Sequence, residues 1–406
     1  ALYIDEGELV DITASGARIE ALGGKPVVRD PMRIDWDAEQ AQKGGYDHFM
    51  LKEIFEQPSV IADTIRGRVD TAGTVALEEV FFDDEFARRL SRIWITACGT
   101  AFHAGLVAKE VFEGICRIPT ECTYAHELRY SDPLIQPGDL VIAISQSGET
   151  ADTLEASRLA RRRGGRVLAI TNRVGSTLAR LADDIIYTRA GPEIAVASTK
   201  AYVAMLVAEY LLAMRVGIAR GDIDDGAART MAATLLGLED QVAAVLQSAE
   251  DVESVAKLLD GVDDIYFIGR GLDYPIAMEG SLKLKEISYL HSEAMPAGEL
   301  KHGTLALVTD ATPVLAVITQ SHVYDKTASA LEEVKARGAS VIAVCYDDDT
   351  KVADHADTLI RIPHTDDRFS PVLSIVPLQL LSYYVARDRG HDIDQPRNLA
   401  KSVTVE

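Results

Sequence analysis

The stretch DLVIAISQSGET, residues 139–150, decides the fold. Five apolar residues in succession end in a turn of hydroxyls and glycine, and the helical pattern TADTLEASRLARRR follows from residue 150. A strand without polar alternation is buried on both faces, which is typical of a parallel sheet covered by helices. The sequence therefore predicts an α/β fold.

The segments on either side of this stretch recur later in the chain. RIWITACG (92–99) precedes it and RVLAITN (166–172) follows it; the same order returns as DIYFIGRG (264–271), PVLAVITQS (313–321) and SVIAV (340–344). The alignment pairs Gly99 with Gly269 and Ser145 with Thr319, at spacings of 46 and 50 residues. Chance likeness of apolar strands is the alternative. We predict two tandem copies, each a parallel sheet flanked by helices in a flavodoxin-like three-layer sandwich, joined by a helical stretch over about 200–258.

Other segments flank the two copies. ALYIDEGELVDI at the start alternates around an Asp5-Glu6-Gly7 turn, as a hairpin does, but two short strands cannot form a core. We interpret this segment as the end of another domain, with a linker at 31–45. The predicted organisation is a domain remnant and linker (1–45), a helical lead-in (46–77), a first domain (78–225), a second domain with its connector (226–392) and a C-terminal tail (393–406).

Composition argues against several classes of protein. Asp and Glu number 63 against 41 Lys and Arg, a net charge of −22, which disfavours nucleic acid and anionic lipid as partners. The four cysteines have neither metal-ligand spacing nor the density of a secreted scaffold, and no nicotinamide motif is present. No apolar run looks long enough to span a bilayer. We expect a cytoplasmic protein that uses no metal and no other cofactor.

The turn at 145–150 is the first candidate for chemistry. Where a parallel strand meets a helix, free backbone N–H groups and the helix dipole favour an anion, and hydroxyls with a glycine allow close approach. The alternative is a plain N-cap in which Ser and Thr cap the helix. The second copy has Thr319-Gln320-Ser321-His322-Val323-Tyr324 here, without the glycine, so only the first copy is expected to have kept a phosphate site.

A charged stripe on one predicted helix is the second candidate. In PIAMEGSLKLKEISYL (275–290), Glu279, Lys283 and Glu286 lie at i, i+4 and i+7 and share a face with apolar neighbours, while Ser281, Lys285 and Ser288 are expected to face solvent. Buried charges are costly unless paired or used, and a carboxylate beside an ammonium in a cleft suits proton transfer. A structural ion pair is the alternative.

The turn at 145–150 and the two tandem copies resemble those of a known family. The hexapeptide 145–150 is similar to the sugar isomerase (SIS) domain signature, and two such domains in tandem resemble the glutamine:fructose-6-phosphate aminotransferase family. Residues 1–45 resemble the end of that family's glutaminase domain. The resemblance implies that the phosphate of fructose-6-phosphate binds at Ser145, Gln146, Ser147 and Thr150. Where the family often has Ser this chain has Ala101, so only Thr100 is carried over there. Val196 and Ser198 match residues that touch the sugar, although Ser198 also suits a helix N-cap.

The same resemblance implies the catalytic residues. Glu286 would be the base that moves a proton between C1 and C2, assisted by Lys283, with Glu279 among the substrate-binding residues. His302, in the GELKHG run (298–303), would open the sugar ring, in its own or in a partner subunit's site. Lys401 would form a Schiff base with the open ketose, and Ala400 lies in a tail that covers the sugar. Without the resemblance, His302 fits a surface histidine and the tail a frayed end.

The implied function is the conversion of fructose-6-phosphate and ammonia to glucosamine-6-phosphate, with glucose-6-phosphate as a further ligand. Ammonia would come from a glutaminase domain missing here, so glutaminase activity is expected to be absent, and a homodimer is expected. The alternatives are another enzyme of the SIS class, either a fructosamine-phosphate deglycase or a phosphosugar isomerase, and a non-catalytic sugar-phosphate sensor.

Overall fold

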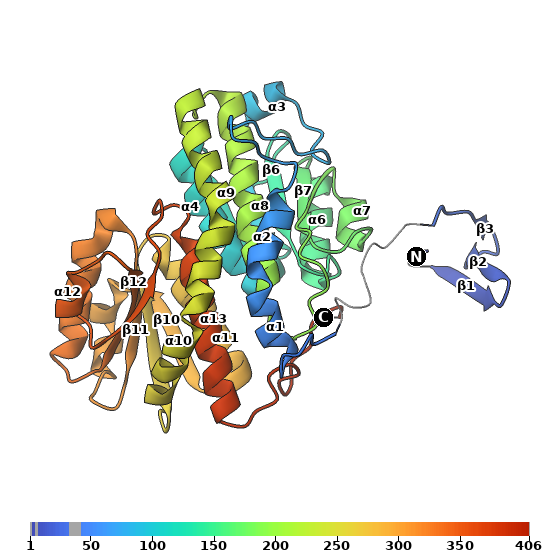
Figure 1. The fold of residues 1–406 in the computed structure, drawn as a ribbon. Helices are drawn as coiled ribbons and strands as arrows, with labels where there is room; N and C mark the ends of the chain where they lie inside the picture. The colour runs from blue at the N-terminus through green and yellow to red at the C-terminus, as the bar shows by residue number, and fades with distance from the viewer. Residues whose placement is uncertain (1, 5–6, 32–41, 406) are drawn as a thin grey trace.

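The computed structural model describes residues 2–4, 7–31 and 42–405, and these contain two five-stranded parallel sheets separated by a layer of helices (Figure 1). The strands of the first sheet lie in the order β5-β4-β6-β7-β8. Its elements are β4 (Ile93–Ala97), α4 (Thr100–Ile115), β5 (Thr120–Tyr124), α5 (Ala125–Leu128), β6 (Leu140–Ile144), α6 (Ala151–Arg162), β7 (Arg166–Thr171), α7 (Thr177–Leu181) and β8 (Asp184–Tyr187).

The second sheet repeats this arrangement, in the order β10-β9-β11-β12-β13. Its elements are β9 (Asp264–Gly269), α11 (Asp273–Ser288), β10 (His291–Pro296), β11 (Val314–Ile318), α12 (Tyr324–Lys335), β12 (Val341–Tyr346), β13 (Thr358–Ile362) and α13 (Ser370–Asp388). Strand β4 corresponds to β9, β6 to β11 and β7 to β12, so the predicted duplication is confirmed. The central strands β6 and β11 are buried along their whole length, as their unbroken apolar sequences indicate.

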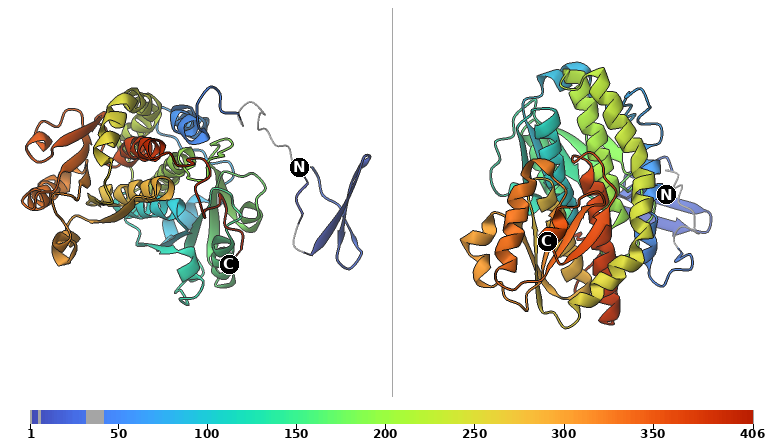
Figure 2. Two further views of the ribbon diagram at one scale, coloured as in Figure 1. Left: turned by 90° about the horizontal axis from the view of Figure 1, so that it is seen from below. Right: turned by 60° about the vertical axis from the view of Figure 1, so that its left-hand side comes forward.

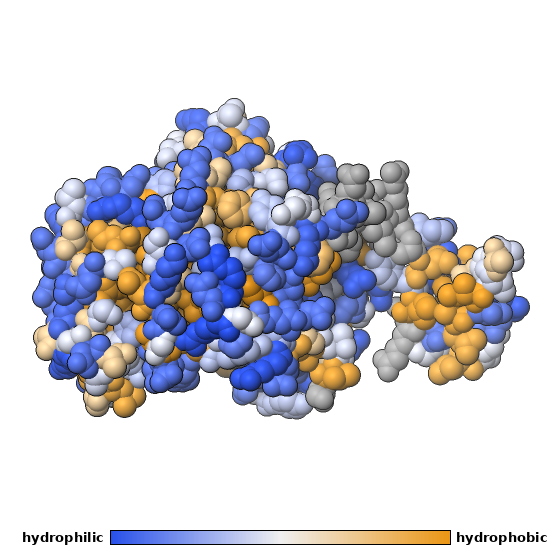
Figure 3. Space-filling model, turned by 60° about the horizontal axis from the view of Figure 1, so that its bottom comes forward, coloured by the Kyte–Doolittle hydropathy of each residue, from blue (hydrophilic) through white to orange (hydrophobic). Residues whose placement is uncertain are grey.

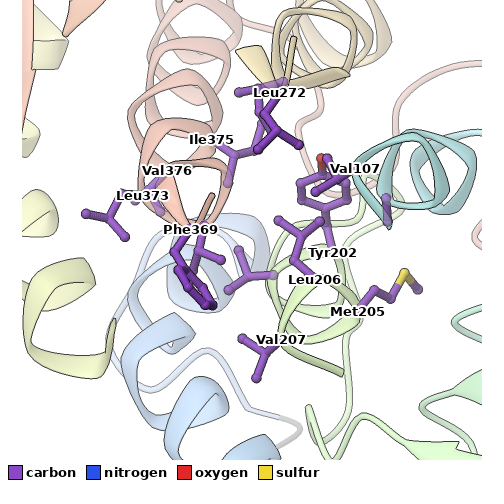
Figure 4. Packing of buried hydrophobic residues seen from close by; sticks show 14 of the residues in the cluster. Val107, Tyr202, Met205, Leu206, Val207, Leu272, Phe369, Leu373, Ile375 and Val376 are labelled. Carbon is purple, nitrogen blue, oxygen red and sulfur yellow. The ribbon is translucent and has the colours of Figure 1, made fainter. Parts of the chain in front are cut away.

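The remaining helices complete the layer between the sheets, which also contains α4, α11 and α13, or extend it at its edges (Figure 2). They are α1 (Phe49–Phe55), α2 (Gln57–Ile65), α3 (Asp84–Arg89), α8 (Lys200–Arg220), α9 (Asp225–Gln247) and α10 (Ala249–Ala256). The outer faces of the two sheets have their own small cores, but the inner faces share one large cluster. Figure 4 shows its centre, where Val107 of α4, Tyr202 of α8 and Ile375 of α13 point toward one another.

Helix α8 corrects one expectation from the sequence. It is long and apolar enough to cross a membrane, contrary to the expectation that no such run exists, but 89% of its apolar window is buried inside the protein. It packs mainly against α2, α3 and α4 and also contacts α9, α13 and β7. An interior helix covered on all sides is apolar all round, which explains both its composition and its position.

The N-terminal segment forms a small separate sheet of β1 (Glu8–Thr13), β2 (Gly16–Ala21) and β3 (Pro26–Val27). A hairpin was predicted around Asp5-Glu6-Gly7, of which Asp5 and Glu6 lie outside the described residues; the hairpin of β1 and β2 reverses at Ala14-Ser15. Apolar side chains gather on the visible face of this sheet (Figure 3), and Leu9, Ile12, Leu22 and Val28 are exposed. Residues 32–41 of the predicted linker lie outside the described residues.

Candidate active site

The turn between β6 and α6 is built around one close approach. Gly148 has φ +64°, and a Cβ there would lie 2.1 Å from Ser176 Oγ, so glycine alone fits. The Ser145 hydroxyl accepts a hydrogen bond from the Gly148 N–H at 3.1 Å and contacts Thr150 Oγ1 at 3.0 Å. The turn is therefore held from within, with its hydroxyls gathered on one side.

The outward amides of this turn are open. Within the described part of the chain, the N–H groups of Gln146, Ser147 and Thr150 donate to no protein acceptor. They lie at the N-terminus of α6, a 12-residue helix whose dipole end is positive. Neutral donors and a dipole can thus hold an anion here without a lysine or an arginine.

This turn forms one wall of a cavity of about 280 Å³. The volume is close to the lower end of small-molecule sites, about 300 Å³. The other walls come from α4, α8, α11, the loop before α8 and the C-terminal tail. Of the residues predicted for the site, the cavity is lined by Thr100, Ser145, Gln146, Ser147, Thr150, Val196, Ser198, Lys283, Glu286, Ala400 and Lys401.

The charged stripe of α11 faces this cavity and the core below it. Lys283 Nζ lies 2.5 Å from Glu286 Oε2 and 3.5 Å from Glu279 Oε1, and it also donates to Thr100 Oγ1 at 3.0 Å. The side chains of Lys283 and Glu279 are 1% and 0% exposed, whereas Glu286 is 21% exposed at the cavity wall. The pair is therefore not an ordinary surface ion pair, which would lie in water.

Lys283 is held in its charged form. Burial alone would lower the pKa of its ammonium, but the carboxylates of Glu286 and Glu279 raise it above the ordinary value. A lysine whose pKa is raised is a poor nucleophile and a good hydrogen-bond donor to a developing oxyanion. Lys283 is therefore suited to polarising a sugar oxygen beside Glu286.

One expectation for α11 is wrong. Ser281 and Ser288 were expected to face solvent, but both are buried, and Ser281 Oγ lies 3.0 Å from Ser292 Oγ on β10. Lys285 alone of the three is exposed. The helix packs against its own sheet on that side, and small hydroxyl side chains permit the close contact.

The tail lies over the cavity as a roof. Its hydrogen bonds run from Ala151 N–H to the Val403 carbonyl at 3.1 Å and between the hydroxyls of Ser147 and Ser402 at 3.0 Å. Lys401 Nζ donates to Glu193 Oε2 at 2.5 Å and lies beside the cavity, 24% exposed. Composition alone favoured a frayed end, which is wrong for residues up to 403.

Glu193 organises the loop under the roof. Its buried carboxylate also accepts hydrogen bonds from the Thr199 and Ala201 amides at 2.9 and 3.0 Å and from Ser198 Oγ at 2.9 Å. Burial alone would raise the pKa of Glu193, but Lys401 and these hydrogen bonds lower it. For nearby Glu53, burial first and the Glu193 charge second raise the pKa to about 8. The resting Lys401 is thus paired with an ionised carboxylate.

Two predicted site residues lie outside the cavity wall. Glu279 is fully buried behind it, where it accepts hydrogen bonds from Thr100 Oγ1 at 3.0 Å and from His103 Nδ1 at 2.7 Å. His302 is exposed at the end of a short 3-10 helix (Glu299–His302) and does not line the cavity. Within this chain the structure does not bring His302 to Glu286.

Sequence reasoning missed three residues that hold the site together: Glu193, His103 and Ser402. His103 stands three residues after Thr100 on the same helix, a spacing that could have suggested it, whereas Glu193 lies in a loop and gave no such signal. Ser402 adjoins Lys401 and gave no signal of its own.

Comparison with known proteins agrees with this geometry. The family model for the SIS domain matches residues 87–215 and 258–387. Glutamine–fructose-6-phosphate aminotransferase [isomerizing] from Symbiobacterium thermophilum is 50% identical over the whole chain, and the one from Thermus thermophilus is 46% identical. The chain spans about two thirds of the length of these relatives, 67% in both cases.

Two solved structures are also similar. The C-terminal domain of glucosamine-fructose-6-phosphate aminotransferase from Francisella tularensis matches with a TM-score of 0.82 at 38% identity, covering 87% of this chain and 99% of that one. A putative phosphosugar isomerase from Silicibacter pomeroyi matches with a TM-score of 0.70 at 26% identity, covering 85% and 99%. The chain therefore belongs to the SIS-domain proteins and, among them, to the glutamine–fructose-6-phosphate aminotransferase [isomerizing] family.

Proposed function

We propose that this chain carries the sugar-phosphate half of glucosamine-6-phosphate synthesis, converting fructose-6-phosphate and ammonia to glucosamine-6-phosphate. One observation carries the proposal: the open amides of the 145–150 turn and the carboxylate of Glu286 line the same cavity. The turn would bind the phosphate, and the sugar would extend under the tail toward α11. The base and the anion site are then at opposite ends of one ligand.

The chemistry begins with the ketone. The amine of Lys401 would add to C2 of the open-chain sugar and release water, giving an imine. Its ammonium must first give up a proton, and the carboxylate of Glu193 is the base in contact with it. Ammonia would then displace the lysine and leave an imine at C2. Roles for Val196, Ser198 and Ala400 as sugar contacts belong to the same proposal.

The second step is proton transfer. Glu286 would remove a proton from C1 and return it to C2, while the proton of the C1 hydroxyl passes to the nitrogen, which turns the 2-imine into a 2-amino aldose. Lys283 would donate a hydrogen bond to the C1 oxygen as charge develops there, and Thr100 and Glu279 would keep its ammonium in place. His302 would open the ring of a sugar bound in a partner subunit's site, because it does not line the cavity of its own chain.

The supply of ammonia requires a further domain. We propose that glutamine is hydrolysed by a glutaminase domain, which would supply the ammonia, and that the residues of this chain do not catalyse that hydrolysis themselves. The exposed apolar face of the small N-terminal sheet supports the proposal, since such a face is normally covered by another domain. A homodimer and a cytoplasmic location are proposed as well.

The test uses fructose-6-phosphate without ammonia. The same base should then move the C1 proton and yield glucose-6-phosphate, and Glu286→Gln should abolish this turnover while sugar-phosphate binding remains. Glu110→Gln, on the exposed side of α4, is the matched control and should change neither. A non-catalytic sensor would show binding without turnover in every variant. Turnover unchanged in Glu286→Gln would refute the assignment.

A further inference from the structure

The second sheet keeps the turn that binds the anion in the first, but its donors are occupied. Strand β11 ends at Ile318, and Thr319, Gln320 and Ser321 stand where Ser145, Gln146 and Ser147 follow β6. In the first copy, the amides of Gln146 and Ser147 have no protein acceptor within the described residues. The corresponding amides of the second copy donate to carboxylates.

Two aspartates provide these acceptors. The N–H groups of Thr319 and Gln320 both donate to Asp273 Oδ2, at 2.8 and 3.2 Å, and the Thr319 hydroxyl donates to Asp273 Oδ1. The Ser321 N–H donates to Asp367 Oδ2 at 2.8 Å. Asp273 is 1% exposed, so its carboxylate lies inside the turn as a bound anion would.

Asp273 also occupies a special place in the chain. It is the first residue of α11, the helix that carries Glu279, Lys283 and Glu286. The 13 residues from Asp273 to Glu286 span about 20 Å of helix. Hydrogen bonds from two amides and one hydroxyl therefore fix one end of this helix to the carboxyl edge of the second sheet (Figure 1).

We propose that the second domain's anion turn is filled by the chain's own Asp273, with Asp367 beside it, and that this internal ligand anchors helix α11. The second domain then takes no sugar phosphate, and its ligand turn has become a fixed support for the catalytic helix of the first site. Asp273 is a positioning residue. Three observations agree with this: the equivalence of the turns, the occupied amides, and the location of the carboxylate on the helix that it fixes.

Asp273→Ala with added sodium formate tests the proposal. Removing the carboxylate empties the turn, and formate supplies a carboxylate of the same size. The variant should have a lower melting temperature that rises saturably with formate but not with sodium chloride at equal ionic strength. Wild type sets the baseline, since its open 145–150 turn can also take formate, and the rise in Asp273→Ala should exceed that baseline. The control is Asp139→Ala. It removes a buried carboxylate that accepts hydrogen bonds from the Gln136 N–H and the Trp94 indole at the start of β6, the end of that strand away from the 145–150 turn.

A second readout rests on the proposed function. In Asp273→Ala, the kcat for isomerisation of fructose-6-phosphate should fall about tenfold while KM stays near the wild-type value, because a displaced helix misplaces Glu286 without touching the phosphate turn. Formate should restore kcat. Failure of the isomerase assay in wild type would count against the proposed function alone, since the melting experiment does not depend on turnover.

Two outcomes of the melting experiment would contradict the proposed role of Asp273. No formate-specific stabilisation of Asp273→Ala, or an equal response in Asp139→Ala, would show that the turn does not select an anion. If Asp273→Ala fails to accumulate in folded form, its refolding yield in formate and in chloride decides the question: recovery in formate alone supports the proposal, and equal yields contradict it.

Discussion

Replacing Gly148 with alanine is the sharpest test of the phosphate site. The residue has φ +64°, and an added Cβ would lie 2.1 Å from Ser176 Oγ, 2.6 Å from Ser176 Cβ and 2.9 Å from Thr171 Oγ1. The left-handed conformation costs a residue with a side chain about 1–2 kcal/mol. The overlap adds about 1–3 kcal/mol, because Ser176 is fully buried and cannot move away freely.

The turn would relieve this strain by moving. Because Ser176 also caps α7, by accepting a hydrogen bond from the Ala179 N–H, displacing Ser176 has its own cost of about 1 kcal/mol. A shift of the turn misplaces the free amides of Gln146 and Ser147. We expect the affinity for fructose-6-phosphate, measured by titration calorimetry, to fall more than about tenfold, which corresponds to about 1.4 kcal/mol.

Gly221→Ala is the matched control. Gly221 has φ +80° at the end of α8, but an added Cβ there meets nothing within 4 Å, so this variant has the backbone strain without the overlap. Its affinity for the sugar phosphate should equal that of wild type. Ser176→Gly should partly restore binding in the Gly148→Ala background. Wild-type affinity in Gly148→Ala itself would refute the assignment of this turn as the phosphate site.

Three further predictions concern the remaining walls of the site. Lys401→Arg keeps a cation beside Glu193 but cannot form an imine, so borohydride should attach fructose-6-phosphate covalently to wild type and not to this variant, as intact-protein mass spectrometry can check. Thr100→Val removes the hydroxyl between Glu279 and Lys283, and steady-state kinetics should show kcat about tenfold lower with KM nearly unchanged. Glu53 has a pKa raised to about 8, so the stability that it contributes is fully present below about pH 4.5 and is lost as the pH rises through 8; urea unfolding should show that Glu53→Gln weakens this decline, and an equal decline in both proteins would contradict the assignment.

The two sheets could be predicted because the sequence of each strand by itself indicates that the strand is buried. Unbroken apolar runs such as 140–144 and 314–318 mean burial on both faces wherever they occur, and the glycine-to-hydroxyl spacing fixed the order of the repeat. The stripe on α11 was predictable for the same reason, since helical spacing alone places Glu279, Lys283 and Glu286 on one face.

Features that depend on distant partners were not predictable. Ser281 and Ser288 look like surface residues until β10 is placed against them. The tail looks disordered because its partners, Ala151, Ser147 and Glu193, stand more than two hundred residues earlier in the chain. Likewise, Asp273 resembles any aspartate at the start of a helix, and nothing in its local sequence indicates the hydrogen bonds that it accepts from the turn after β11.

The hydrophobic cluster shared by the two sheets explains why the chain needs its second domain, even though we propose that this domain binds no sugar phosphate. Helices from both copies contribute to it, as α4, α8, α11 and α13 pack together, so neither half has a complete interior alone. Deleting the second copy would leave a large apolar surface in water and remove the helix that bears the base. Because the two copies share one interior, loss of either copy would destabilise the other, and the second copy also supplies the helix that carries Glu286 to the first site.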